Sequence, residues 1–252
     1  ANVMGKLEDY LQTEWPELDV YLTSVTDHFA TVSVCGPNSK KIIFEVIPDL
    51  DLRDESFPHM SFKDTKIGNI NCKVMRISFT GEHSYEINIR ANYGKSVWEK
   101  CMEAGKNFNI TPYGTETMHL LRAEKGFIIV GQDTDATMTP IDLQMDWIVS
   151  KKKYDFIGKR SLYRSDTIKE DRKQLVGLLT DNPDEILEEG AQIVADIKKS
   201  PIEMLGHVTS SYYSPNLKKS RALGVVRGGK NMMGQKLIIP MEKKNINVTV
   251  AD

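Results

Sequence analysis

Apolar positions near the start of the chain recur at helical intervals. Residues 4–15 place large apolar side chains three and four residues apart, and Pro16 then interrupts the pattern. This spacing predicts an amphipathic helix over residues 4–15.

Two β-branched and apolar runs follow, at 20–25 and 30–34, with the turn-forming pair Asp27-His28 between them. They predict a β-hairpin. Residues 40–47 then read as a short helix that ends at Pro48.

Further strands are expected around Lys66 and over 72–79 and 84–89, and a helix over 94–108. Thr111-Pro112 predicts the start of a second helix, and Gly126 predicts its end. Helices that alternate with antiparallel hairpins favour an α+β fold with a ferredoxin-like split βαβ core over a doubly wound sheet.

The pattern changes at about residue 165. A polar stretch, 165–173, is typical of a linker, and six short apolar runs spaced by turn residues follow it. This spacing predicts a small β-barrel or jelly roll. We therefore expect an α+β domain over 1–165 and a C-terminal β domain over 166–252.

Composition narrows the range of partners. The 252 residues are 40% hydrophobic and 27% charged, with a net charge of −2. No global basic field attracts nucleic acid or an anionic membrane, and no apolar run is long enough to span a bilayer. The first residues lack the apolar segment of a signal peptide. We expect a cytoplasmic protein with no nucleic-acid or membrane partner.

Few chemical motifs stand out. The three cysteines are widely spaced, no Cys/His cluster has metal-ligand spacing, and neither GxGxxG nor GxxxxGK[ST] occurs. We predict buried free thiols and no metal site. The basic residues at 151–153 and 159–160 either form a solvated loop, which we favour, or hold phosphates or a polyanionic tail.

Glu86 is a charge inside a predicted strand. Side chains alternate along a strand, so Tyr85 and Ile87 face one way while Glu86 and Asn88 face the other. Such a carboxylate either points to water or receives a ligand.

Four segments in order resemble signatures of the glycine cleavage T-protein (aminomethyltransferase) superfamily. They are RISFTGEHSYEINI (76–89), LRAEKGFIIVGQDTDATMTPIDLQMDW (121–147), FIGKRSL (156–162) and GHVTSSYYSPNLKKSRALGVV (206–226). NITPYGTETMHLLRAEKGFIIVGQDTD, WIVSKKKYDFIGKRS and MLGHVTSSY more closely resemble the C-terminal part of heterotetrameric sarcosine oxidase alpha subunits. This likeness runs from about Trp15 to the last residue and implies part of a T-protein fold.

The resemblance implies a tetrahydrofolate site. Glu86 is expected to accept hydrogen bonds from the pterin, and Phe79, where many T-proteins have tyrosine, to stack on it. Arg122 either contributes to the folate site or forms a salt bridge on its helix. Tyr113 is also expected to bind the folate. Trp147 lies near the same motifs, and packing in the core is the alternative for both aromatics.

The resemblance also implies a reaction. In the intact assembly a flavin on another subunit oxidises sarcosine, and tetrahydrofolate captures the methylene group, which gives glycine and 5,10-methylenetetrahydrofolate. The family's catalytic acidic residue is expected before Ala1, flavin and NAD on other parts of the assembly, and other sarcosine oxidase subunits as partners. Two alternatives are a standalone aminomethyltransferase and a non-catalytic folate-binding or scaffold fragment.

Overall fold

The structure is a computed structural model that describes residues 2–252. The chain forms two compact units. The first comprises residues 2–78 and 82–112, and the second comprises residues 79–81 and 113–252. Each unit has its own hydrophobic core and is described by itself.

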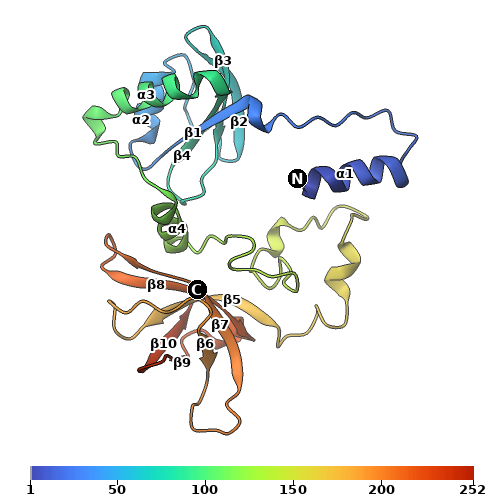
Figure 1. Cartoon of the computed structure of the whole chain (residues 1–252), viewed down its shortest axis with the longest axis vertical. Coiled ribbons are helices and arrows are strands. Elements are labelled where there is room, and N and C mark those ends of the chain that lie inside the picture. The colour runs from blue at the N-terminus through green and yellow to red at the C-terminus, as the bar shows by residue number, and fades with distance from the viewer. Residues whose placement is uncertain (1) are drawn as a thin grey trace. The chain divides into compact units, whose positions relative to one another are not determined.

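The first unit is a four-stranded sheet with two packed helices (Figure 1). Its elements are α1 (Asn2–Thr13), β1 (Phe29–Cys35), α2 (Ser39–Val46), β2 (Ser61–Ile67), β3 (Ile70–Arg76), β4 (Ser84–Arg90) and α3 (Gly94–Ala104), with 3₁₀ turns at Thr26–His28, Ala91–Tyr93 and Lys106–Phe108. The strand order is β1-β4-β3-β2, and every neighbouring pair is antiparallel. Consequently β1 and β3 run parallel with β4 between them, and their connection carries α2 and β2.

Alternation along the strands gives this sheet two different faces. In β4, Tyr85, Ile87 and Ile89 are fully buried, in one core with Ile43 of α2 and Val97 of α3. The intervening side chains of β4 are on the opposite face, where they are only half-buried. Helices therefore cover one face of the sheet, and polar side chains occupy the other.

One predicted hairpin is wrong. Residues 20–25 form no strand, and Val20, Tyr21 and Val25 are exposed. The second half of that pattern is β1, which pairs with β4 instead. The predicted helix over 4–15 is confirmed as α1.

The second unit contains one α-helix and a closed barrel. Its elements are α4 (Thr115–Glu124), β5 (Lys173–Thr180), β6 (Gln192–Val194), β7 (Met204–Ser214), β8 (Lys219–Arg227), β9 (Lys236–Pro240) and β10 (Asn245–Ala251), with 3₁₀ turns at Asp146–Ile148, Lys159–Tyr163 and Gly229–Met232. The barrel order is β10-β5-β8-β7-β6-β9, and the last strand joins β9 to β5. The predicted α+β fold followed by a C-terminal β-barrel is confirmed.

The start of α4 lies later than predicted. Gly114 precedes the first helical turn, and the Thr111 hydroxyl donates to the carbonyl of Asn109 (3.4 Å) instead of capping the helix. Gly126 ends the helix as expected, because its φ of 72° lies in the left-handed region that glycine adopts readily.

Among residues 2–252, no helix combines the length and apolar character that crossing a bilayer requires. In the same range, no three His, Cys, Asp or Glu side chains gather as a possible metal site.

Candidate functional site

Glu86 lies in the middle of β4, on the face opposite the helices. Its neighbours in register are Ser33 of β1 and Met75 of β3. Burial raises the pKa of its carboxyl group above the usual 4.5. Within residues 2–252 no hydrogen bond or ion pair reaches this carboxylate, so it keeps its capacity to accept hydrogen bonds from a ligand.

Asn88, two residues further along β4, shares this face. The Thr31 hydroxyl on β1 donates to its Oδ1 at 2.7 Å, which fixes the side-chain amide. The amide nitrogen, Nδ2, is buried, and nothing in the described part of the chain accepts a hydrogen bond from it.

These two side chains form a polar pair on a rigid element. Two residues along a strand span about 6.6 Å, so the Glu86 acceptor and the Asn88 donor can contact the same small molecule. A carboxylate accepts two parallel hydrogen bonds, and a primary amide donates to a carbonyl oxygen. The arrangement therefore suits one edge of a flat heterocycle that carries both N–H groups and an oxygen.

The neighbouring charged groups Lys73 and Asp64 pair with one another. Lys73, opposite Asn88 in register, donates to Asp64 Oδ1 at 2.8 Å, and its ammonium lies 3.8 Å from the centroid of the Phe62 ring. Unlike the charged groups of Lys73 and Asp64, the carboxylate of Glu86 and the amide nitrogen of Asn88 have no hydrogen-bond partner within the described residues.

The other predicted site residues belong to the second unit. Phe79 and Tyr113 are each 39% exposed, and Trp147 is 75% exposed. Two residues after Phe79, the backbone of Gly81 packs closely against Lys125, because a Cβ added to Gly81 would lie 2.3 Å from Cγ of Lys125. Trp147 is not a core residue, contrary to the packing interpretation.

Arg122 is completely buried, although it is charged. Its guanidinium donates to the carboxylate of Asp133, to the carbonyl of Phe127 (3.0 Å) and to Ser210 Oγ (2.7 Å). It therefore joins α4 to the following loop and to strand β7.

The carboxylate of Asp133 is saturated with donors. Besides Arg122, it accepts from the backbone N–H of Ile129 (2.9 Å) and from the hydroxyls of Thr209 (2.6 Å) and Ser210 (2.7 Å). The structure contains an ion pair of Arg122, but its partner lies in the loop after α4 and not on the helix, as the salt-bridge interpretation expected. A contribution of Arg122 to ligand binding stays a prediction, and from this position it would act through the loop that it holds.

The sequence matches two families that follow one another along the chain. Residues 1–153 match the family described as the GCVT N-terminal domain, and residues 173–252 match the glycine cleavage T-protein C-terminal barrel domain. The chain belongs to the glycine cleavage T-protein family. The resemblance based on the sequence motifs is confirmed.

Sarcosine oxidase subunits and aminomethyltransferases are similar to this chain over most of its length. It is 49% identical to a sarcosine oxidase subunit alpha from Corynebacterium sp. (strain P-1), over 100% of the chain and 26% of that relative. It is 38% identical to the subunit from Rhizobium meliloti (strain 1021), over 95% of the chain and 24% of the relative. An aminomethyltransferase from Thermoanaerobacter sp. (strain X514) is 30% identical, over 92% of the chain and 61% of the relative.

The chain thus spans about a quarter of the length of the sarcosine oxidase alpha subunits that it matches. A crystal structure of the glycine cleavage system aminomethyltransferase T from Bartonella henselae has the same fold. The TM-score is 0.73 at 22% identity, over 89% of this chain and 58% of the other.

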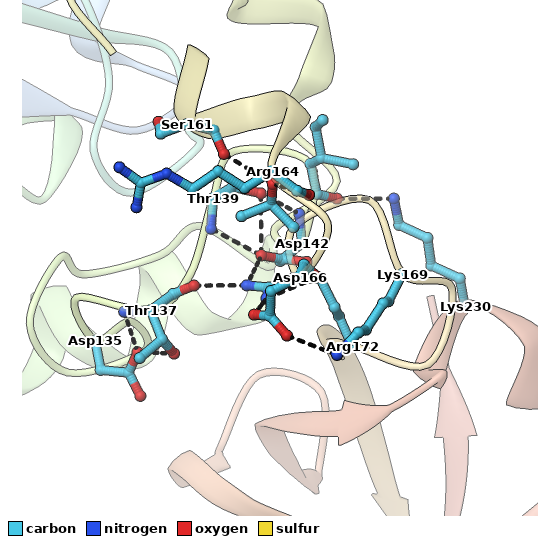
Figure 2. A network of polar contacts seen from close by, with 12 residues as sticks. Asp135, Thr137, Thr139, Asp142, Ser161, Arg164, Asp166, Lys169, Arg172 and Lys230 are labelled. Atoms are coloured by element: carbon cyan, nitrogen blue, oxygen red, sulfur yellow. Dashed lines mark hydrogen bonds and ion pairs between the residues drawn. The ribbon is translucent and has the colours of Figure 1, made fainter. Parts of the chain in front are cut away.

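A second polar network in this T-protein family chain was not predicted (Figure 2). Arg172 lies in the polar stretch that sequence patterns indicate as a linker. Its guanidinium donates twice to Asp142 (2.9 and 2.8 Å), and also to Asp166 (2.8 Å) and to the carbonyl of Thr137 (2.5 Å). A single arginine in a charged stretch carries no sequence signal for this clamp.

Burial and hydrogen bonding oppose one another at Asp142. Burial acts to raise the pKa of its carboxyl group, but hydrogen bonds from Arg172 and Thr139 outweigh this effect, and the net pKa is lowered below 3.8. Asp142 is therefore a stable anion inside the loop, and the network is structural.

Proposed function

We propose that this chain is the tetrahydrofolate-binding, one-carbon-transfer domain of a larger enzyme of the sarcosine oxidase type. The single observation that carries the proposal is the half-buried carboxylate of Glu86, which lacks a partner within the described residues. Identity of 49% to a sarcosine oxidase alpha subunit, against 30% to an aminomethyltransferase, supports the oxidase type.

The residues present fit a reduced pterin. The ring presents adjacent N–H donors, which match the two acceptor oxygens of Glu86. It also presents an acceptor on the same edge, and the buried amide of Asn88 is an unpaired donor on the same strand. Phe79 belongs to the second unit, and its stacking on the pterin stays a prediction from the resemblance.

Tetrahydrofolate, when bound, supplies the nitrogen that captures the one-carbon unit released on oxidation of an N-methyl amine. The role of Glu86 is to bind and orient. Its position on β4 fixes the direction of the carboxylate, and partial burial strengthens each hydrogen bond because fewer water molecules compete. We assign no proton transfer to a residue of this chain.

The complete reaction belongs to the assembly. We propose sarcosine as the amine and a multi-subunit enzyme, in line with the names of the relatives. Glycine as the product, and flavin and NAD on other parts of the assembly, are proposed from the resemblance alone. The aminomethyltransferase alternative is supported by the shared fold and by the 30% identity. Methylene capture from oxidised sarcosine, rather than from a lipoyl-bound aminomethyl group, distinguishes the two.

Calorimetric titration of the chain with tetrahydrofolate tests the proposal. Glu86→Gln should weaken binding by about 1.5–3 kcal/mol, the range for a hydrogen bond to a charged group. Glu45→Gln is a matched control, because Glu45 is exposed on α2. Equal affinities of parent and Glu86→Gln would falsify the assignment of Glu86, and absence of binding by the parent would contradict the proposed function.

A further inference from the structure

Asn88 lies on the same face of β4 as Glu86, and its side-chain amide has an unpaired end. Its Nδ2 is buried, and no acceptor reaches it within residues 2–252. Most buried donors in folded proteins have a partner, and one without a partner is destabilising unless a ligand or water supplies the acceptor.

The orientation of this amide is fixed by the fold. Thr31 on β1 is directly opposite Asn88 and donates its hydroxyl proton to Oδ1 at 2.7 Å. The amide oxygen therefore has a partner on β1, whereas the amide nitrogen has none within the described residues.

We propose that Asn88 donates a hydrogen bond to the 4-oxo oxygen of the pterin ring, and so makes the site selective for 4-oxo over 4-amino pteridines. This inference rests on the proposed function, because it assumes that Glu86 holds the amino-pyrimidine edge. The 4-oxo oxygen is adjacent to the ring N–H on that edge. A ligand that spans the distance of about 6.6 Å between two alternate strand positions can then use both residues.

Access to Nδ2 requires a movement on this face, since water does not reach the atom. Lys73 is the cross-strand neighbour of Asn88. Its ammonium is held at the surface by Asp64, whose side chain is 75% exposed. Exposed ion pairs of this kind contribute little, so the lysine side chain can move at small cost.

Thr31 has a distinct, positioning role. It does not contact the ligand in this arrangement, but its hydroxyl pairs with Oδ1 and so leaves Nδ2 as the end of the amide without a partner in the described residues. Loss of its hydroxyl should therefore reduce the selectivity between ligands more than the affinity for either.

The test compares two probes, tetrahydrofolate and 4-amino-4-deoxytetrahydrofolate, by titration calorimetry. The 4-amino compound changes two contacts, because its ring N3 lacks the proton that Glu86 accepts and its amino group replaces the acceptor for Asn88. The parent chain should therefore prefer the 4-oxo compound by about 100-fold, with about tenfold from each hydrogen bond. Asn88→Asp replaces the donor by an acceptor and should lower this preference by about tenfold, and Thr31→Val should lower it by a smaller factor.

Asn71→Asp is the matched control. It makes the same chemical change at an exposed position on the same sheet face and should keep the ratio of the parent. Because each ratio is measured within one variant, a partly misfolded sample lowers both affinities and leaves the ratio intact.

The outcomes separate the two proposals. If the parent binds neither probe, the proposed function fails, and this inference fails with it. If the parent binds tetrahydrofolate but Asn88→Asp keeps the parent's ratio, only the role of Asn88 is overturned. If the parent prefers the 4-amino compound, the roles of both Glu86 and Asn88 are overturned.

Discussion

Asp133 in the second unit and Glu86 in the first are both carboxylates withdrawn from bulk water, but their surroundings differ. Asp133 is fully buried and accepts hydrogen bonds from a guanidinium, a backbone N–H and two hydroxyls. Glu86 is half-buried and accepts none within residues 2–252. A satisfied buried charge fixes the fold, whereas an unsatisfied one is destabilising until a ligand arrives, and so indicates a binding site.

The largest effect is expected from breaking the satisfied pair. Arg122→Met should lower the free energy of unfolding by about 3–5 kcal/mol, because it leaves the Asp133 carboxylate buried without its cation. Chemical denaturation followed by circular dichroism measures the loss. In the double variant with Asp133→Asn the losses should not add, since both changes remove one interaction. A loss below about 1 kcal/mol for Arg122→Met would contradict a structural role.

A smaller effect is expected at Arg172. Arg172→Ala should lower the free energy of unfolding by about 2 kcal/mol, since Asp142 keeps its hydrogen bonds from Thr139 when the guanidinium is removed. Lys169 also pairs with Asp166, but both side chains are mostly exposed to solvent, so Lys169→Ala should leave the denaturation midpoint unchanged. Equal losses in the two variants would show that the clamp on Asp142 contributes nothing.

The smallest effect, of opposite sign, is expected at Glu86. Without ligand, Glu86→Gln should raise the free energy of unfolding at pH 7 by less than about 1 kcal/mol, because water still screens this half-buried group. The folded-state pKa of Glu86 is raised. The stability linked to its protonation is therefore present below the unfolded-state pKa and is lost as the pH rises through the folded value.

The gain from Glu86→Gln should accordingly shrink between pH 7 and pH 4. Denaturation of parent and variant at both pH values measures it, with Glu45→Gln as the exposed control. A difference between parent and variant that is the same at both pH values would contradict burial of the carboxylate. Together with weaker folate binding, the expected result would show that Glu86 is retained for the ligand and not for stability.

Much of the fold could be predicted from local pattern. All six barrel strands fall on the predicted apolar runs, because each run is apolar and is bounded by turn residues. Residues 20–25 have the same β-branched composition but form no strand. Whether an apolar run finds a strand to pair with depends on the tertiary fold, which composition does not encode.

The candidate site was predictable only in part. Alternation along β4 gives the face of Glu86 and of Asn88 correctly, because the strand period is fixed. The buried pairing of Arg122 was not predictable, since Asp133 lies in a loop eleven residues away instead of one helical turn. The unpaired amide nitrogen of Asn88 was not predictable either, because it depends on which side chain of β1 lies opposite Asn88.

The barrel cannot close until its last strand, β10, has been synthesised. Its last strand, Asn245–Ala251, is inserted between β5 and β9, so these two strands stay unpaired along one edge until residue 251 has left the ribosome. Until then each presents free backbone amides and carbonyls, which are templates for intermolecular pairing. Deletion of residues 245–251 would thus convert the closed barrel into an open sheet with two unpaired edges, which is prone to aggregation.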